Sequence, residues 1–402
     1  MLQNKRIGVL ITMPRHGGGS YQWTINILHV LNDYRKSHGN ITIHIFKYLQ
    51  YENVDELKSV FPDFYIHTIG KIEKLKAGFL RKLAFTIPSL IPFIRQFFPL
   101  NSIITKKNID LMLFPTTVLD SSLCNQKHIF FLADIAHVFY PWFPEVSANG
   151  QLRIRHILFK YGLHHADQIV VESKQLRSDI AKYYGADETK TDVLYQIFSQ
   201  TLENTDFKDD EYANFRHNLP SRYVFYPAQL WEHKNHRNLL HAMKLVSGEF
   251  PDLCLVLTGS RKEGDKQIFT LIKELELHNN VKYLGYVPDE FMPILYKNAQ
   301  ALVMPTYFGP TNIPTLEAFY YGCPAVISEL PGVIEQTGDA ALLFNPDLPE
   351  DIAKKIILVL KNENLRNEMV RKGYERLRVL SYENYRDTLF AILDKNLTGI
   401  EV

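Results

Sequence analysis

The segment FGPTNIPTLE at residues 308–317, together with WEHKNHRN at residues 231–238, carries most of the information in this chain. A loop of Gly, Pro, Thr and Asn leads directly into an apolar helix that carries one acid, Glu317. The start of such a helix offers backbone N–H groups to an anion. Lys234 lies between a predicted strand and a predicted helix, so its ammonium group can add a point charge for the same anion. The two segments predict a pocket for a nucleoside diphosphate that carries a sugar.

Composition narrows the class of protein. The chain has 402 residues, of which 46% are hydrophobic and 22% charged, so we expect two or three globular domains. The net charge of +1 argues against a general nucleic-acid binder, which needs a large basic excess. The three cysteines, Cys124, Cys254 and Cys323, are too scattered for a disulfide framework or a metal site. We expect a reducing compartment and no metal.

The apolar runs of the chain are all short. The first 19 residues lack a cleavage site of small residues and are better interpreted as a first strand than as a signal peptide. No apolar run reaches the roughly 20 residues that span a bilayer. We therefore expect a cytoplasmic protein.

Two successive alternations of strand and helix predict the fold. In the first half we expect strands at 6–12, 41–46, 111–114, 128–132 and 168–171, and in the second half at 223–227, 253–257, 281–284, 301–304 and 325–328. They are continuously apolar, as in parallel sheets with both faces covered. The alternations predict an α/β protein with two doubly wound domains, at 1–199 and 200–381, joined by a polar linker at 200–211. A ligand that both domains share would lie in a cleft between them.

The stretch 71–107 has a composition of its own. It holds eight Lys or Arg residues against one acid, Glu73, and interleaves them with Phe, Leu and Ile. Such a stretch can lie on an anionic membrane surface. The alternative is a pair of helices whose apolar side covers the sheet and whose lysines are solvated.

Three further segments follow predicted strands of the first half. Gly17, Gly18 and Gly19 let a backbone approach a ligand closely, or form only a flexible turn. Asp134 and His137 are placed to face the cleft, although a buried capping role explains them equally well. Ser173 is suited to be the N-cap of the helix that follows it, and Glu172 would then face the cleft or solvent.

In the second half, Gly259 and Val287 lie in loops that follow predicted strands. Such loops commonly hold a nucleobase through backbone groups. Lys234 and the loop 309–313 occupy the same structural position after their own strands, which makes the set more informative than any single member. Glu317 lies early in its helix, where a carboxylate is favoured by the helix dipole and can accept hydrogen bonds from ribose hydroxyls.

At these residues the chain resembles the retaining glycosyltransferases of family 4, which have the GT-B fold of two facing Rossmann-like domains, and in particular their bacterial mannosyltransferase-like subgroup. YPAQLWEHKNHRNLLHA at 226–242 looks like the family's donor-phosphate segment, with Lys234 as its lysine. MPTYFGPTNIPTLEAFYYGCPAVIS at 304–328 looks like its donor loop and helix, and 134–143 resembles a segment that approaches the sugar. The terminal helix at about 381–397 would, by the same resemblance, return to the first domain.

The chain departs from the family pattern at two positions. Of the two acids usually found eight residues apart, Glu317 fits the second, which holds the ribose, but the first position is Gly309. An arginine usual five residues before the lysine is replaced by Gln229. Lys234 would then be the main side-chain charge on the diphosphate.

The resemblance implies transfer of a hexose, with mannose as the first choice, from a nucleotide-diphosphate sugar to a glycan or lipid-linked acceptor in bacterial surface-polysaccharide synthesis. It implies retention of configuration, no metal or other cofactor, and a location in the cytoplasm or on the inner face of the membrane. Asp134, His137 and Lys234 would be the catalytic residues. The donor would be bound by Gly17, Gly18, Gly19, Gln229, Lys234, Gly259, Val287, Gly309, Pro310, Thr311, Asn312, Ile313 and Glu317. Two alternatives remain open: a catalytically silent sugar-nucleotide binder, and a sugar-nucleotide epimerase of the same fold.

Overall fold

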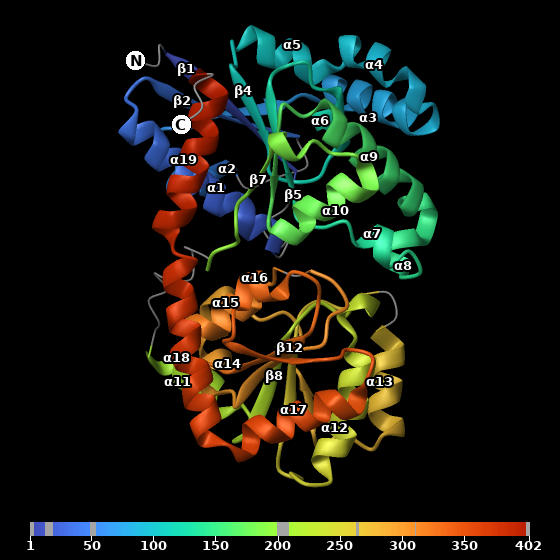
Figure 1. The fold of residues 1–402 in the computed structure, drawn as a ribbon, viewed down its shortest axis with the longest axis vertical. Helices are drawn as coiled ribbons and strands as arrows, with labels where there is room; N and C mark the ends of the chain where they lie inside the picture. Colours follow the sequence, from blue (N-terminus) through green and yellow to red (C-terminus); the bar gives the residue numbers. More distant parts are fainter. Residues whose placement is uncertain are drawn as a thin grey trace. The chain divides into compact units, whose positions relative to one another are not determined.

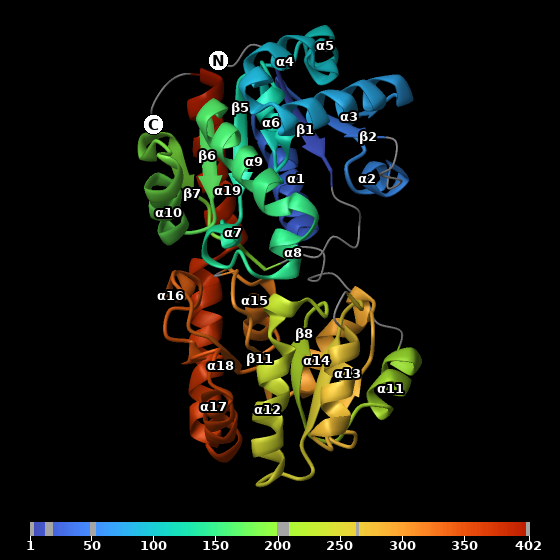
Figure 2. The ribbon, with the colours of Figure 1, turned by 90° about the vertical axis from the view of Figure 1, so that its right-hand side faces the viewer.

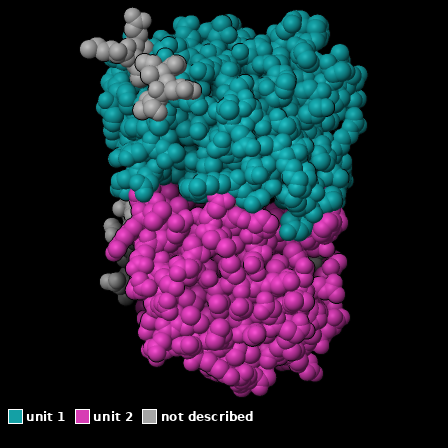
Figure 3. Space-filling view, viewed as in Figure 1, with its two compact units in different colours: residues 1–141, 147–195, 383–402 teal, residues 142–146, 196–382 magenta. Residues whose placement is uncertain are grey.

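The computed structural model describes residues 4–12, 19–48, 54–198, 209–262, 265–309 and 311–398. The chain divides into two compact units, coloured separately in Figure 3. Unit 1 comprises Met1–Pro141, Ser147–Tyr195 and Glu383–Val402, and unit 2 comprises Trp142–Val146 and Gln196–Tyr382. The short segment 142–146 thus belongs to unit 2 although its sequence neighbours belong to unit 1. Most of the polar linker expected at 200–211 lies outside the described residues.

Unit 1 is built on a parallel seven-stranded sheet with the order β3-β2-β1-β4-β5-β6-β7. Its strands are β1 (Lys5–Ile11), β2 (Ile41–Tyr48), β3 (Tyr65–Ile69), β4 (Leu111–Phe114), β5 (His128–Leu132), β6 (Gln168–Val171) and β7 (Thr191–Val193). Its helices are α1 (Gly19–Ser37), α2 (Val54–Val60), α3 (Lys71–Thr86), η1 (Pro88–Leu90), α4 (Ile91–Phe97), α5 (Pro99–Lys106), α6 (Leu119–Leu123), α7 (Ala136–Phe139), η2 (Ala148–Gly150), α9 (Gln151–His165), α10 (Lys174–Tyr184), η3 (Glu188–Lys190) and α19 (Tyr382–Thr398). The short α8 (Pro144–Ser147) spans the boundary of units 1 and 2 along the chain.

Unit 2 is built on a parallel six-stranded sheet with the order β10-β9-β8-β11-β12-β13. Of these strands, β8 and β12 are labelled in Figure 1, and β8 and β11 in Figure 2. Its strands are β8 (Tyr223–Pro227), β9 (Cys254–Thr258), β10 (Val281–Tyr283), β11 (Ala301–Met304), β12 (Ala325–Ser328) and β13 (Ala341–Phe344). Its helices are α11 (Asp209–His217), η4 (Glu232–Lys234), α12 (His236–Ser247), α13 (Asp265–Glu274), η5 (Asp289–Phe291), α14 (Met292–Asn298), α15 (Ile313–Tyr320), α16 (Val333–Thr337), α17 (Pro349–Lys361) and α18 (Glu363–Val379). Both sheets have the doubly wound order of Rossmann folds, which confirms the predicted α/β class.

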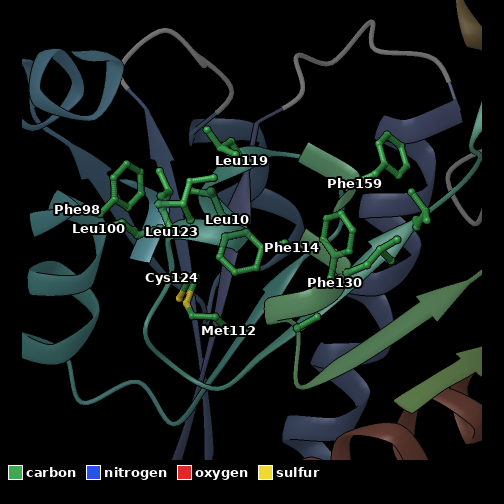
Figure 4. Packing of buried hydrophobic residues seen from close by; sticks show 14 of the residues in the cluster. Leu10, Phe98, Leu100, Met112, Phe114, Leu119, Leu123, Cys124, Phe130 and Phe159 are labelled. Atoms are coloured by element: carbon green, nitrogen blue, oxygen red, sulfur yellow. The ribbon is translucent and has the colours of Figure 1, made fainter. Parts of the chain in front are cut away.

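The core of unit 1 follows from the alternation of side chains along its strands. Phe130 and Leu132 of β5 join a fully buried cluster with residues of α3, α5, α6 and α9, part of which is drawn in Figure 4. Phe131, between them, points to the other face and meets Trp23 of α1 edge-on at 5.6 Å. The indole of Trp23 also donates to the Tyr385 hydroxyl of α19 over 3.0 Å. The sheet is therefore covered on both faces, as its continuously apolar strands predict.

The central strands and the terminal helix agree with the sequence-based expectations. Strands β4, β5, β6, β8, β11 and β12 have the expected bounds, and α19 begins one residue after the expected start. Three strands were not expected, namely β3, β7 and β13, and each lies at an edge of its sheet. Edge strands are only partly covered, so their sequences need not be apolar throughout: Tyr65 of β3 is 55% exposed and β7 reads Thr-Asp-Val.

The stretch 71–107 forms α3, η1, α4 and α5, which is one helix more than the expected pair. Ala77, Ala84, Ile91 and Ile94 lie in the core of unit 1, as the alternative to membrane contact requires. Six large apolar side chains of the same stretch nevertheless remain exposed: Ile72, Leu75, Phe79, Ile87, Phe93 and Phe97. No helix among the described residues is both long and apolar enough to cross a membrane.

Candidate functional site

The sheet of unit 2 reverses its winding between β8 and β11, which are neighbours in space but not in sequence. Ligands of doubly wound sheets bind beyond the carboxyl ends of the strands at this switch point. The segment that contains Gln229 and Lys234 leaves β8, and the loop 305–312 leaves β11. The sequence-predicted donor segments therefore emerge from the two strands where the topology places a ligand.

Lys234 ends a short 3-10 turn, η4, and several hydrogen bonds fix the backbone of this turn and of Asn235, which follows it. The carbonyl of Lys234 accepts from the Tyr226 hydroxyl over 2.8 Å. Asn235 follows in the left-handed conformation, with φ 58°, and its side chain accepts from the Asn238 N–H at the start of α12. The same side chain donates to the carbonyl of Pro346 over 2.8 Å. Asn tolerates this backbone conformation better than most residues, which explains why it follows the lysine.

Hydrogen bonds join the Lys234 turn to the loop after β11. The Tyr307 N–H donates to the His233 carbonyl over 2.9 Å. The Thr306 hydroxyl donates to the Phe308 carbonyl over 3.0 Å and lies 3.4 Å from the His233 carbonyl. Two segments that are more than 70 residues apart are thereby held side by side. The half-buried Lys234 and the start of the donor loop share one edge of the sheet.

Hydrogen bonds within the loop 305–312 and from Gln336 occupy several of its polar groups. Gly309 has φ 90°, a conformation that favours glycine. The Asn312 side chain donates to the Gly309 carbonyl, while the Asn312 N–H donates to Gln336 over 2.9 Å. That N–H is therefore occupied by Gln336. Among the described residues, the buried Thr311 hydroxyl has no hydrogen-bond partner; Pro310 lies outside the described residues, and Ile313 begins α15.

Glu317 lies in the second turn of α15 and is only 5% exposed. One of its carboxylate oxygens accepts from the Tyr296 hydroxyl over 2.5 Å. Burial, followed by the neighbouring Glu317, raises the pKa of Tyr296 well above its usual value, so Tyr296 stays a donor. The carboxylate is thus held in one orientation by a neighbour that the sequence pattern did not reveal.

Gly259 lies after β9, where the chain leaves no room for a side chain. Its φ is 117°, and a Cβ atom would lie 2.4 Å from the Ala228 carbonyl oxygen. Its N–H donates to the Gly285 carbonyl over 2.7 Å, which joins this loop to the one that contains Val287. Gln229, on the loop after β8, accepts from the Trp231 indole through its side-chain oxygen over 2.9 Å.

A contact that the sequence did not indicate joins Glu145 to His233. The Glu145 carboxylate accepts from the His233 N–H over 2.9 Å and pairs with the His233 ring Nδ1. Burial favours the neutral acid, but the hydrogen bonds from His233 outweigh it and lower the pKa of Glu145. The His233 ring also stacks on the Phe308 ring, with ring centroids 4.0 Å apart. His236, at the start of α12, is 2% exposed, and burial, with Lys234 and His233 nearby, lowers its pKa to about 3.

The candidate residues of unit 1 are more enclosed. Asp134 accepts from the Ala136 N–H over 2.8 Å, the local capping contact that was the alternative to a cleft-facing role. His137 is 1% exposed and pairs with the Tyr184 hydroxyl over 2.5 Å. Burial, followed by His156 and Arg155, lowers the pKa of His137 to about 3, so the ring is neutral. The helix packing around α7 thus turns this imidazole inward.

The structure also describes Ser173 and Glu172, for which the sequence predicted a capping role and an orientation. Ser173 is confirmed as an N-cap, since its hydroxyl accepts from the Leu176 N–H over 3.0 Å. Glu172 was expected to face the cleft or solvent; it is 5% exposed, which excludes the solvent-facing alternative. Gly17 and Gly18 lie outside the described residues, and Gly19 is the first residue of α1.

A buried ionic network in unit 1 was also not anticipated. Asp120 of α6, 3% exposed, accepts from the Tyr48 hydroxyl over 2.6 Å and from two nitrogens of Arg81 over 2.6 and 2.8 Å. Tyr48 ends β2 and α6 follows β4, so the network lies at the carboxyl edge of the first sheet. No group of three or more His, Cys, Asp or Glu side chains in the described ranges is arranged to hold a metal ion.

Comparisons with known proteins agree with this geometry. Residues 207–376 match the family described as glycosyl transferases group 1. The O-antigen chain mannosyltransferase B of Escherichia coli is 32% identical over 166 residues, 40% of this chain and 43% of that protein. The O-antigen chain mannosyltransferase RfbU of Salmonella typhimurium is 26% identical over 190 residues, 47% of this chain and 50% of that protein. The chain spans about half the length of the curated relatives it matches.

The fold is shared with solved structures at lower sequence identity. Sucrose-phosphate synthase from Thermosynechococcus elongatus aligns with a TM-score of 0.75 at 18% identity, covering 98% of this chain and 100% of that one. This likeness confirms the predicted GT-B fold. The comparisons agree with the resemblance inferred from these segments: residues 207–376 carry the glycosyl transferases group 1 match, and the chain is similar to proteins named mannosyltransferases.

Proposed function

We propose that this protein is a retaining glycosyltransferase that moves a hexose from a nucleotide-diphosphate sugar to a glycan or lipid-linked acceptor. The observation that carries the proposal is the junction of the Lys234 turn and the donor loop at the switch point of unit 2, held by the Tyr307 N–H on the His233 carbonyl. Mannose is our first choice of sugar, because the similar proteins of Escherichia coli and Salmonella typhimurium are named mannosyltransferases. Their names likewise suggest a role in surface-polysaccharide synthesis.

Lys234 has the central role in this proposal. The departing diphosphate gains negative charge as the bond to the sugar breaks, and a preorganised cation stabilises that charge. The Thr311 hydroxyl, which has no partner among the described residues, is our second candidate for a phosphate contact. Because Gln336 already accepts from the Asn312 N–H, the helix start contributes less than its sequence suggests. We propose that these groups act without a metal or other cofactor.

The remaining donor contacts follow from the loops around the switch point. We propose that Glu317, oriented by Tyr296, accepts from the ribose hydroxyls. Backbone groups near Gly259 and Val287 would hold the base, and Gln229 and Gly309 would border the phosphates and sugar. In unit 1 we assign sugar contact to the half-buried Asp134. The phosphate contact of Gly17, Gly18 and Gly19 stays a prediction, because Gly17 and Gly18 lie outside the described residues. The buried His137 supports that segment and is a positioning residue.

We also propose that the stretch 71–107 contacts an anionic membrane surface. On α3 the apolar Ile72, Leu75 and Phe79 are exposed beside several lysines, and Phe93 and Phe97 of α4 form an exposed ring pair. A groove of about 500 Å³ next to this surface is lined by Arg81, Lys82 and Arg153 together with apolar Phe85 and Ile154. Its lining contains no acid, which suits the phosphate of a lipid. Such contact would bring the protein to the inner face of the membrane.

Co-sedimentation with vesicles tests the membrane contact. We expect binding to vesicles with anionic lipid and much weaker binding to neutral ones. Phe79→Ser with Phe93→Ser should reduce that binding at least severalfold, while the surface variant Tyr183→Ser should not, since Tyr183 lies on α10. Equal binding by all three proteins would remove this part of the proposal.

A transfer assay tests the enzymatic proposal. The protein is incubated in EDTA with GDP-, UDP-, ADP- and dTDP-hexoses and a panel of lipid-linked and free glycans, and product and released nucleotide are both measured. We expect product with one donor, in the anomeric configuration of that donor. The alternative of a silent sugar-nucleotide binder is motivated by Gly309 and Gln229, which replace the usual acid and arginine. Tight binding of a nucleotide sugar without product across the panel would favour that alternative.

A further inference from the structure

The segment Trp142–Val146 leaves the chain of unit 1 and packs as part of unit 2. Phe143 is 5% exposed and lies against Tyr307 and Phe308, with ring centroids 5.4 and 6.2 Å apart. Two residues later, Glu145 pairs with both the backbone N–H and the ring Nδ1 of His233. One short segment therefore touches both the turn that carries Lys234 and the loop that leads to Gly309.

The contacts link Glu145 to His233 and His233 to Phe308. The Glu145 carboxylate fixes the His233 ring, and that ring stacks on Phe308 at an interplanar angle of 18°. The His233 carbonyl in turn accepts from the Tyr307 N–H. The Glu145 and His233 side chains are each 10% exposed, so water competes little for the hydrogen bonds between them. Removing the carboxylate would leave a nearly buried N–H and an imidazole without this partner.

We propose that Glu145 is a positioning residue of the donor site, which acts through His233 to hold Lys234 and the segment Thr306–Gly309 in their binding geometry. The acid usual at position 309 is absent, and the loop at this point contains a conformationally free glycine. Glu145, from a distant part of the sequence, contacts His233, whose ring stacks on Phe308 directly before this glycine. This inference rests on the proposed donor site.

The first test measures the two segments directly, without any nucleotide. Amide hydrogen exchange is followed at 232–236 and 304–309 in the wild type, Glu145→Gln and Glu145→Ala. The control is Glu249→Gln, which removes an exposed carboxylate of unit 2 that pairs with Lys361. We expect faster exchange at both segments in Glu145→Ala, a smaller change in Glu145→Gln, whose amide oxygen still accepts from the His233 N–H, and none in the control. Unchanged exchange in Glu145→Ala would overturn the inference.

The second test measures the consequence for the donor. Dissociation constants for GDP, UDP, ADP and dTDP are compared by calorimetry, and KM is separated from kcat in the transfer assay. Loss of a charge-assisted hydrogen bond predicts about a tenfold weaker nucleotide affinity for Glu145→Ala. Glu145 bonds both the ring and the backbone N–H of His233, and His233→Ala removes only the ring. The loss in Glu145→Ala combined with His233→Ala should therefore be clearly smaller than the sum of the two single losses.

The outcomes separate the inference from the proposed function. Additive losses in the double variant, or an affinity within twofold of the wild type in Glu145→Ala, would overturn the inference while the donor site stands. If the wild type binds none of the four nucleotides, the proposed function fails, and the exchange measurement still decides whether Glu145 holds the two segments.

Discussion

The two units differ in the polar groups that follow the two strands where the winding of each sheet reverses. In unit 2 the loops after β8 and β11 carry a half-buried lysine, a left-handed asparagine and a hydroxyl without a partner among the described residues. In unit 1 the corresponding loops carry polar groups that are closed on one another. The Thr12 and Thr116 hydroxyls share a hydrogen bond of 2.6 Å after β1 and β4, and Asp120 is enclosed by Arg81 and Tyr48.

The difference shows that strand order fixes where a ligand can bind but not whether the residues there are available to it. In unit 2 backbone hydrogen bonds fix the turn that carries Lys234 and join it to the loop after β11, and we propose that the side chains of this edge meet a ligand. In unit 1 the polar side chains hold one another and stabilise the unit. Substitutions should therefore affect binding in one unit and stability in the other.

The largest effect is expected for Lys234→Ala. Removing a preorganised charge from the leaving group should lower kcat by about 100- to 1000-fold. The matched control is Lys244→Ala on the same region of the chain, because Lys244 is exposed on α12 and pairs only over 3.6 Å with Glu276. Steady-state kinetics of donor turnover checks both variants. Activity of Lys234→Ala within a few-fold of the control would place the phosphates elsewhere.

The second effect concerns the stability of unit 1. Arg81→Met leaves the Asp120 carboxylate, 4% exposed, without its cation. Breaking such a pair should cost about 3 kcal/mol of unfolding free energy, and Asp120→Asn in the same chain should recover part of it. Urea unfolding monitored by tryptophan fluorescence measures the loss, and nucleotide affinity should stay at the wild-type value. A change in nucleotide affinity without a loss of stability would contradict the division of roles.

The third effect is a pH dependence in unit 1. The pKa of His137 is about 3 in the folded protein, against an ordinary 6.5, so the unfolded chain binds more protons between these values. Stability from the neutral ring is present above pH 6.5 and is lost as the pH falls towards 3. His137→Gln should flatten this dependence only in part, because burial also lowers the pKa of His44 to about 4. The control is His164→Gln, which removes an imidazole from an exposed position of α9, and the slope of unfolding midpoint against pH is measured for both variants.

The smallest predicted effect is the loss of a helix N-cap, and it should have the same size in both units. Ser173 caps α10 in unit 1 and Asn362 caps α18 in unit 2, each accepting from a backbone N–H over 3.0 Å. Replacing either by Ala should cost about 1 kcal/mol. Exchange of the first-turn amides of each helix gives the comparison. A cost several times larger at one cap would show that the units differ in more than their site residues.

Much of the fold could be predicted because its signals are local. The interior strands are continuously apolar, and the terminal helix α19 lies in a segment that resembles the family's returning helix. The edge strands β3 and β7 were missed because partial exposure lets them carry polar residues. The edge strand β13 reads Ala-Leu-Leu-Phe, so polar residues do not explain why it was missed. The unexpected docking of 142–146 in unit 2 has no local signal at all.

Some residues of the candidate site have a local sequence pattern, whereas the residues that contact them are distant in sequence. Lys234, Gly309 and Glu317 could be proposed as site residues because each lies in a short segment with its own pattern. Their partners could not: Glu145 is 88 residues from His233, and Tyr296 is 21 residues from Glu317. The inward orientation of His137 also depends on Tyr184, a residue of another helix. Sequence shows which residues can do the chemistry, whereas packing decides which of them are held for it.

The most direct test of the central claim is a calorimetric titration with GDP, UDP, ADP and dTDP in EDTA, with hydrogen exchange to locate the nucleotide. The account predicts that one nucleotide binds, that Lys234→Ala loses this binding, and that the bound nucleotide slows exchange at 228–235 and 305–313. Binding that persists in Lys234→Ala, or protection confined to the carboxyl edge of the first sheet, would contradict it.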